Sequence, residues 1–464
     1  AVNTDWNNAG NWSCAIVPGA NDEVILDNSV VSGSYSIILP GSATTTTISK
    51  LTISPNSGNN ITLNLPSTNT GIPGFSVGDN IAATDDIILN DGAILSNSSG
   101  ATSGNGIQVN STSNGTIRIN NGGRYIHNTA RSTAGIVPRL SIISGTEQGI
   151  FEYNFPGTGS AAISASGRNY GALFLTRTSG TGTYAASGAS NLTIRGDFVI
   201  NSGVTFNSTM TADTLIGGNW TQNGTGFSHT STVIFNGASQ QQIGGSAGTN
   251  FNNLTIANTA SVIIPTNTSV TGLLTNNGRL QQTRDVNGSG DVTFLDIGGY
   301  GGVTLNANSS DLGQTTVIIR GNQPCDNDNS SVRRCFDIDP ANKTGRNATV
   351  SFVWDSTELG SQICSTMDAY HWNGASWGTP LTLDTGYGTN GRICTDPGLQ
   401  SLRVTGVTTF SPFAMSSDGS GPTAVSLQSF TAHNQTPILL ILAALLMLGL
   451  VGATAVFRHK TNSR

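Results

Sequence analysis

Charged side chains are scarce in this chain. Asp, Glu, Lys and Arg make up 10% of the 464 residues, against about 25% in an ordinary globular protein. Only 20 residues are Lys or Arg, and the net charge is −6, which argues against the basic footprint of a nucleic-acid-binding protein. We therefore expect no nucleic-acid partner and a surface built from Ser, Thr, Asn and Gly, of which Gly alone supplies 58 residues.

Patterns that carry catalytic chemistry are also lacking. The five His stand far apart, at His127, His229, His371, His433 and His459. They keep no repeated spacing to acidic residues, and no His-Glu-x-x-His helix or P-loop occurs. We therefore expect no enzyme, no catalytic residues and no organic cofactor. A polysaccharide lyase or hydrolase is the less favoured alternative, because such enzymes line one face with carboxylates.

Cysteine is rare before residue 325. The chain has Cys14, Cys325, Cys335, Cys364 and Cys394, and in an oxidising exterior the last four indicate two disulfides. Three pairings are open. The simplest joins Cys325 to Cys335 and Cys364 to Cys394, closing loops of about 11 and 31 residues worth on the order of 3 to 4 kcal/mol each. Cys14 is left over, and we expect a free, buried thiol rather than a cross-link to another chain.

One long apolar run is present near the C-terminus. Residues 438–457 carry no charge, and as a helix they would span roughly 30 Å, which matches a bilayer. We predict a transmembrane helix over 437–457, with membrane lipid as a partner. The anchor residues are Ile438, Leu442, Leu446, Leu450 and Phe457.

The charges that flank this run set its orientation. Arg458, Lys460 and Arg464 follow it, so the positive-inside rule places a short tail, 458–464, in the cytoplasm and the N-terminus outside. Export would require a signal peptide, yet the sequence opens without an apolar leader. We therefore expect a mature cell-surface protein whose signal peptide has been removed.

Short apolar runs separated by Gly, Ser and Asn indicate an all-β fold. One phrase returns three times, as 50–53, 191–194 and 253–256, and such loose self-similarity is typical of a solenoid. We predict an N-terminal cap over 1–30 and a right-handed parallel β-helix over 31–312, with roughly 20 to 25 residues in each coil and coils about 4.8 Å apart. A series of β-sandwiches is the alternative.

The composition changes near residue 313, where Trp and charged residues appear and the apolar runs become longer. Six or seven alternating strands over about a hundred residues indicate an antiparallel β-sandwich over 313–415, stapled by the disulfides. A linker rich in Ser, Gly and Pro, 416–436, separates it from the membrane segment.

Three stretches resemble known bacterial surface proteins. Residues 5–25, with Trp6 and Trp12, resemble the phrase that caps the first coil of surface β-helix proteins, and 192–206 resemble their repeat. Residues 333–413 resemble a β-sandwich module found near the C-terminus of secreted bacterial proteins. The resemblance implies an adhesin-like or surface-layer component and places no catalytic residue.

One phrase has the spacing of a calcium-binding loop. Asp285, Asn287, Ser289 and Asp296 stand at positions 1, 3, 5 and 12, with Gly290 at position 6, as such a loop requires. Position 12 is Asp instead of Glu, and the flanks look like strand and turn, so a polar turn is the favoured alternative. Calcium is the one cofactor that the sequence leaves open.

Two further features of the sequence concern sugars, and neither decides whether a sugar is bound or attached. Trp372 and Trp377 flank Asn373-Gly374 and would either form the core of a hairpin, which we favour, or offer rings to a sugar. Sequons such as those at Asn60, Asn191 and Asn253 are plentiful, and whether they carry glycans is open.

These features predict a structural cell-envelope protein. We expect it to self-assemble laterally with copies of itself as a surface-layer component, tethered by its C-terminal helix. The alternative is an adhesin that binds envelope glycan or another cell.

Overall fold

The structure is a computed structural model that describes residues 3–79, 81, 84–109, 114–326, 328, 330–410, 412–419 and 421–422. All of them belong to one compact unit, Ala1–Thr423. Their helical segments are short 3-10 turns: η1 (Ala9–Asn11), η2 (Val137–Arg139), η3 (Ser356–Glu358) and η4 (Cys364–Thr366). The described residues therefore form an all-β fold, as predicted.

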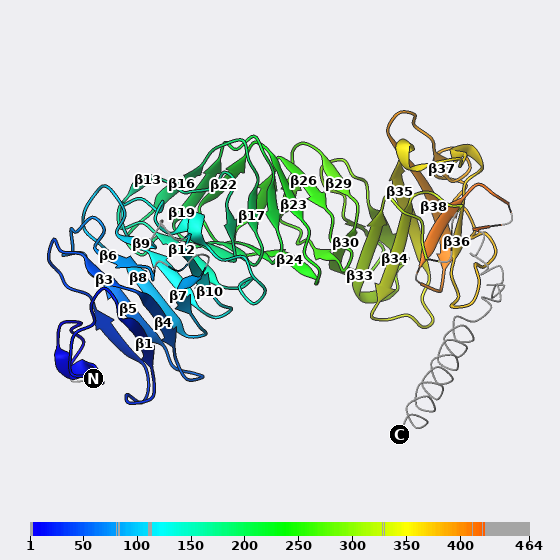
Figure 1. The fold of residues 1–464 in the computed structure, drawn as a ribbon. Coiled ribbons are helices and arrows are strands. Elements are labelled where there is room, and N and C mark those ends of the chain that lie inside the picture. Colours follow the sequence, from blue (N-terminus) through cyan, green and yellow to red (C-terminus); the bar gives the residue numbers. More distant parts are fainter. Residues whose placement is uncertain are drawn as a thin grey trace, which may run out of the picture. The chain divides into compact units, whose positions relative to one another are not determined.

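Parallel ladders stack the first part of the chain into a β-solenoid (Figure 1). Its first coils contribute to three sheets. One contains β1 (Glu23–Asp27), β4 (Lys50–Ser54), β7 (Asp85–Leu89) and β10 (Thr116–Ile119). Another contains β3 (Thr46–Ile48), β6 (Phe75–Val77) and β9 (Ile107–Val109). The third is the long sheet, which runs on through the whole solenoid.

The long sheet receives one strand from each coil. Its parallel members are β2 (Tyr35–Ile38), β5 (Ile61–Leu65), β8 (Ala93–Asn97), β11 (Arg124–His127), β12 (Ile150–Asn154), β15 (Ala172–Thr176), β18 (Phe198–Ile200), β21 (Trp220–Gln222), β24 (Gln241–Gly244), β27 (Val262–Ile263) and β30 (Arg279–Asn287). Adjacent strands in this order pair with one another, so the parallel β-helix predicted from the repeats is confirmed.

The other strands of the later coils form three further parallel sheets. The first contains β13 (Gly159–Ala162), β16 (Gly182–Ala186), β19 (Val204–Ser208) and β22 (Gly226–His229). The second contains β14 (Asn169–Tyr170), β17 (Leu192–Ile194), β20 (Thr214–Ile216), β23 (Thr232–Phe235), β26 (Asn253–Ile256) and β29 (Leu274–Asn276). The third pairs β25 (Thr249–Phe251) with β28 (Thr268–Val270). The repeated phrase accounts for β17 and β26, which share one sheet, and for β4, which lies in another sheet.

Coil length varies more than predicted. Leu63 pairs with Leu95, 32 residues later, whereas Val262 pairs with Leu280, only 18 residues later. Alternate side chains of each strand point inward, since the period of a strand is two. Leu63, Leu95 and Val262 are fully buried, so the core is a continuous stack of apolar side chains along the coils.

From β30 onward the described ladders are antiparallel. β30 pairs in parallel with β27 and antiparallel with β33 (Asp311–Gly321), which extends the long sheet through β34 (Arg334–Pro340), β39 (Phe413–Ser416) and β36 (Asp368–His371). A second sheet contains β31 (Asp291–Phe294), β32 (Val303–Asn306), β35 (Ala348–Asp355), β38 (Leu399–Val407) and β37 (Arg392–Ile393).

The two antiparallel sheets face each other as in a sandwich. The Phe352 ring of β35 lies 5.1 Å from the Phe336 ring of β34 and 5.3 Å from that of Phe413 on β39, centroid to centroid. All three side chains are fully buried. The region thus has the layered, sandwich-like arrangement expected near the C-terminus, while the predicted boundary at residues 312 and 313 stays a prediction.

The N-terminal segment covers the first strand of the long sheet. Asp5 forms a parallel bridge with Ile38 of β2, and the Trp6 side chain is 1% exposed against the core. Trp12 holds it there, because its Nε1–H donates to the Trp6 carbonyl oxygen at 2.9 Å.

Candidate functional site

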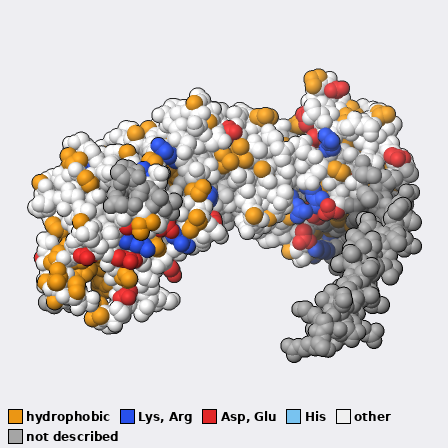
Figure 2. All heavy atoms as spheres, viewed as in Figure 1, with side chains coloured by type: hydrophobic (Ala, Val, Ile, Leu, Met, Phe, Trp, Pro, Cys, Tyr) orange, Lys and Arg blue, Asp and Glu red, His pale blue; other side chains and the backbone are white. Residues whose placement is uncertain are grey.

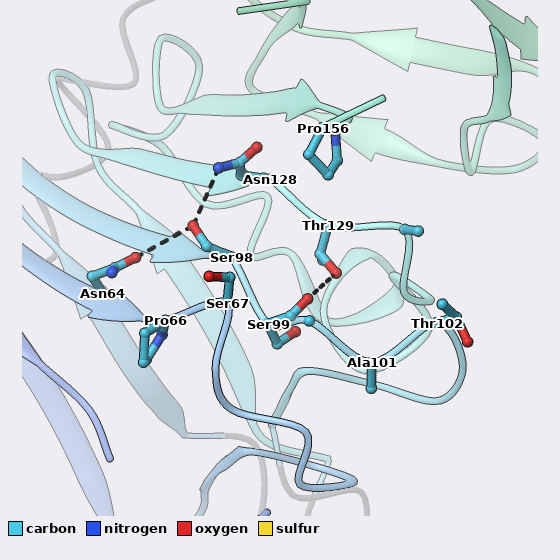
Figure 3. A pocket seen from close by; sticks show the side chains of 12 residues that line it. Asn64, Pro66, Ser67, Ser98, Ser99, Ala101, Thr102, Asn128, Thr129 and Pro156 are labelled. Atoms are coloured by element: carbon cyan, nitrogen blue, oxygen red, sulfur yellow. Dashed lines mark hydrogen bonds between the residues drawn. The ribbon is translucent and has the colours of Figure 1, made fainter. Parts of the chain in front are cut away.

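A groove lies at the carboxyl ends of four strands of the long sheet, β5, β8, β11 and β12 (Figure 3). The residues that follow each strand line it, and its volume is about 460 Å³. Because parallel strands end at the same side of a sheet, residues about 30 positions apart in sequence come together here. We call this site the polar groove. Its lining residues are Asn64, Pro66, Ser67, Ser98, Ser99, Gly100, Ala101, Thr102, Asn128, Thr129, Ala130 and Pro156.

Hydrogen bonds between coils fix the polar groove. Ser98 Oγ donates to Asn64 Oδ1 at 3.4 Å, and Asn128 Nδ2 donates to Ser98 Oγ at 3.2 Å (Figure 3). Thr129 Oγ1 donates to the Ser99 carbonyl oxygen at 2.6 Å. Each bond joins one coil to the next, so the side chains that line the groove are held in a ladder.

The chemistry of the polar groove is neutral. None of the twelve described lining residues carries a charge. Amides, hydroxyls and backbone groups remain to bind a ligand, and such groups suit a polar, uncharged molecule with many hydroxyls. These side chains supply no pair that could act as general acid and base near neutral pH.

A second cavity of about 470 Å³ adjoins the polar groove, because both are lined by Thr129 and Ala130. It is also lined by His127, Arg131 and Tyr153. His127 Nε2–H donates to the Arg131 carbonyl oxygen at 2.9 Å. Since burial disfavours the charged imidazolium, it lowers the pKa of His127 to about 4. The imidazole is therefore neutral at pH 7.

Arg131 is buried beside this histidine, with 4% of its surface exposed. Its Nε donates to the Ser103 carbonyl oxygen at 3.1 Å. Nη1 and Nη2 have no hydrogen-bond partner among the described residues, and burial lowers the pKa of the guanidinium. The side chain remains charged at neutral pH, because an arginine pKa starts above 12.

Burial of His127 predicts a loss of stability in mild acid. The unfolded chain binds a proton near pH 6.5 and the folded chain only near 4, so the stabilisation present above pH 6.5 is lost as the pH falls toward 4. Between pH 7 and pH 5 the free energy of unfolding should therefore fall by about 1–2 kcal/mol less in His127→Gln than in the unmodified chain. The measurement is the free energy of unfolding by urea at each pH.

Asp86 provides the control of opposite sign. It is fully buried on β7, and burial raises its pKa to about 6. Its ionisation therefore lowers the free energy of unfolding as the pH rises from 4 through 6. Gly115 leaves room for it, since a Cβ there would lie 1.7 Å from Asp86 Oδ2. Asp86→Asn should steepen the acid loss. An unchanged pH slope in His127→Gln would contradict the histidine assignment.

The structure places the predicted calcium residues on β30, in the turn that follows it and after β31, and Ser289 lies in that turn. Asp285 and Asn287 lie on β30, where Asn287 Nδ2 donates to Asp285 Oδ2 at 2.7 Å. Asp296 follows β31. The backbone N–H of the preceding residue, Leu295, donates to the side-chain Oε1 of Gln282 at 3.0 Å. The first and last predicted ligands therefore belong to different segments, Asp285 to β30 and Asp296 to the residues after β31, and calcium binding stays a prediction. In the described part of the chain, no three His, Cys, Asp or Glu side chains form a metal-binding group.

Both predicted disulfides are confirmed. Cys325 is bonded to Cys335 and Cys364 to Cys394. The prediction of a buried Cys14 was wrong, because this free cysteine is exposed. It lies after η1, in a turn that precedes β1 and does not enter the core.

Trp372 and Trp377 form the hairpin contact that was favoured from sequence. They pair in an antiparallel bridge, and their ring centroids lie 5.4 Å apart. The predicted anchor residues from Ile438 to Phe457 lie outside the described residues. Within the described residues, no helix has the length and apolar character needed to cross a membrane.

Sequence reasoning missed the polar groove. Its only signal was the recurrence of Asn, Ser and Thr directly after an apolar strand, as in 98–99 and 128–129. These residues become a site only once the coil register is known. It also missed a Gly-x-Ser-x-Gly spacing at 244–248. There Ser246 lies exposed in the turn after β24, and the next element is strand β25 rather than a helix, so the nucleophile elbow is not formed.

Comparison with protein-family models, with curated proteins and with solved structures finds no match to this chain.

Proposed function

We propose that this chain is an extracellular structural protein of the cell envelope that packs laterally with copies of itself into a surface layer. The observation that carries the proposal is how the coils are held. Uncharged ladders join coil to coil, as in Thr205 with Thr225 at 2.8 Å and Ser228 with Asn207 at 3.0 Å. A scaffold of this kind keeps its shape without a charged surface.

The outer surface supports close packing of copies. Most of the face in Figure 2 carries neither acidic nor basic side chains, and the few charged atoms occur in small groups. With a net charge of −6 on 464 residues, repulsion between copies is weak. Hydroxyl and amide side chains remain to form hydrogen bonds between neighbours.

We include in the proposal the handedness, the membrane segment and the location that the sequence predicts. The winding is right-handed, the segment 437–457 crosses the membrane, and the N-terminal part lies outside the cell. The two disulfides support this location, since disulfides persist in oxidising compartments. Membrane lipid and envelope glycan are the further partners.

Cryo-electron imaging of native envelopes tests the lattice, and we expect two-dimensional order. Charges introduced on one face of the solenoid should disrupt this order. The double variant Thr193→Asp with Thr255→Asp places charges on the sheet that contains β17 and β26. The matched double variant, Thr221→Asp with Thr283→Asp, places them on the long sheet. At least one pair should abolish order while the melting temperature stays within a few degrees. A chain that remains monomeric under all conditions, with or without calcium, would contradict the proposal.

An adhesin is the second candidate, and the neutral polar groove favours it. A monodisperse chain that attaches to glycan-coated surfaces, and that loses attachment in Asn128→Ala, would replace the lattice proposal with this one.

A further inference from the structure

We propose that the antiparallel sheets carry a saccharide-binding site at one end, separate from the polar groove. Three loops converge there, following β34, β36 and β38, and they enclose a volume of about 620 Å³. This is within the range of small-molecule sites, roughly 300–1,000 Å³. We call it the Trp372 groove. Its lining includes His371, Trp372, Asn373, Thr408, Thr409 and Phe410.

Trp372 is held in place before any ligand arrives. Its backbone N–H donates to the Pro412 carbonyl oxygen at 3.0 Å. Its ring meets that of Trp377 edge to face, at 62° between planes, and Trp377 packs against the buried disulfide Cys325–Cys335. The half-buried Trp372 ring therefore lies on a covalently stapled support, which lowers the entropy lost on binding.

The turn after Trp372 is also fixed. Asn373 Oδ1 accepts hydrogen bonds from the backbone N–H groups of Ala375 and Ser376, both at 2.9 Å. This turn sets the position of the loop that lies beside the ring. On the neighbouring loop, Thr409 Oγ1 lies 3.5 Å from His371 Nδ1.

The side chains match the two kinds of surface that a sugar presents. A pyranose has an apolar face of C–H groups, which packs on an aromatic ring such as Trp372 or Phe410. Its hydroxyls need donors and acceptors, and Thr408 and Thr409 are both exposed in the lining of the same groove. His371 also lines the groove, and its buried Nε2 has no hydrogen-bond partner among the described residues.

The charge of the groove narrows the ligand further. Lys343 lines it and forms an exposed ion pair with Asp339, and the described lining contains no carboxylate. A cationic ligand over the Trp372 ring is therefore disfavoured, and calcium-mediated sugar binding has no acidic ligands here. A neutral or anionic saccharide fits.

Glycan-array binding and calorimetry with the full chain test the site, using neutral and uronic-acid oligosaccharides. Because the proposed membrane segment requires a detergent, the detergent must not be a glycoside. A maltoside headgroup would compete with the glycan for the Trp372 groove. We expect Trp372→Ala to weaken binding of the selected glycan about tenfold or more, and Trp372→Phe to retain most of it, since the aromatic face is kept. The exposed pair Thr408→Ala with Thr409→Ala should weaken it several-fold without affecting the core. Thr205→Ala, on the solenoid, is the control.

Two results would overturn the inference: no glycan bound at millimolar concentration, or full affinity in both Trp372→Ala and the threonine pair. Saccharide binding that depends on Asn128 and not on Trp372 would assign it to the polar groove. The lattice proposal is judged separately, because Trp372→Ala should still assemble. An unmodified chain that binds glycan but forms no ordered layer would contradict only the lattice.

Discussion

Arg334→Met is expected to lower the free energy of unfolding by about 3–5 kcal/mol, because it leaves a buried carboxylate without its counter-charge. The Arg334 side chain is 1% exposed. Its Nη2 lies 2.7 Å from Glu358 Oε2, and Nε donates to Oε1 at 3.1 Å. Burial raises the pKa of Glu358, and Arg334 opposes that rise. In the variant this carboxyl group must either take up a proton or remain charged in the core.

The same guanidinium satisfies backbone groups of the second antiparallel sheet and of the segment between its strands β31 and β32. Nη1 donates to the carbonyl oxygens of Tyr300, Gly301 and Val353 at 2.8–3.1 Å, and the guanidinium carbon lies 3.8 Å from the centroid of the Tyr300 ring. The Tyr300 hydroxyl accepts from Asn276 Nδ2 of β29 at 2.9 Å. One arginine thus links the last coil of the solenoid to both antiparallel sheets.

Urea unfolding followed by near-ultraviolet circular dichroism measures this prediction. The double variant Arg334→Met with Glu358→Leu should recover part of the loss, since no unpaired charge remains, but not all of it, since three carbonyl oxygens have lost a donor. Lys343→Met is the matched control, because its pair with Asp339 is exposed and should contribute no more than about 1 kcal/mol. A double variant no more stable than Arg334→Met would show that the ion pair is not the cause.

The sequence was sufficient to predict the coarse fold, because the fold rests on local patterns. Alternating apolar residues and the phrase repeated at 191–194 and 253–256 predicted stacked strands, and both segments lie in one sheet. Spacing left three disulfide pairings open, and the structure has the simplest of them, between cysteines adjacent in the sequence. Cys14 shows the limit of this reasoning: burial depends on whether a turn reaches the core, and composition does not reveal it.

The sites could not be predicted, because they depend on register. Offsets between paired coils range from 36 residues, as for Leu51 and Ile87, to 18 residues, as for Val262 and Leu280, so no fixed period tells which Asn or Ser will stack. The buried network of Asn276, Tyr300, Arg334 and Glu358 joins residues from four separate segments. In the sequence Arg334 resembles any surface arginine beside a cysteine.

Removal of the Cys364–Cys394 disulfide is expected to lower the free energy of unfolding by about 3–4 kcal/mol, through the loop entropy that the unfolded chain regains. The bond spans 30 residues, whereas Cys325–Cys335 spans 10. The chain-entropy model therefore predicts a loss about 1 kcal/mol greater for Cys364→Ala with Cys394→Ala than for the Cys325 and Cys335 pair.

The larger loop also contains β36 and Trp372, so its release should weaken saccharide binding as well as stability. Urea unfolding of both double variants, with and without a reductant, measures the difference. Reductant should lower the stability of the unmodified chain by at least as much as either pair of substitutions, and it should leave a variant without all four cysteines unchanged. If loss of the shorter loop were the more damaging, packing of Cys325–Cys335 against Trp377 would outweigh loop entropy. The stability of the Trp372 groove would then depend chiefly on that disulfide.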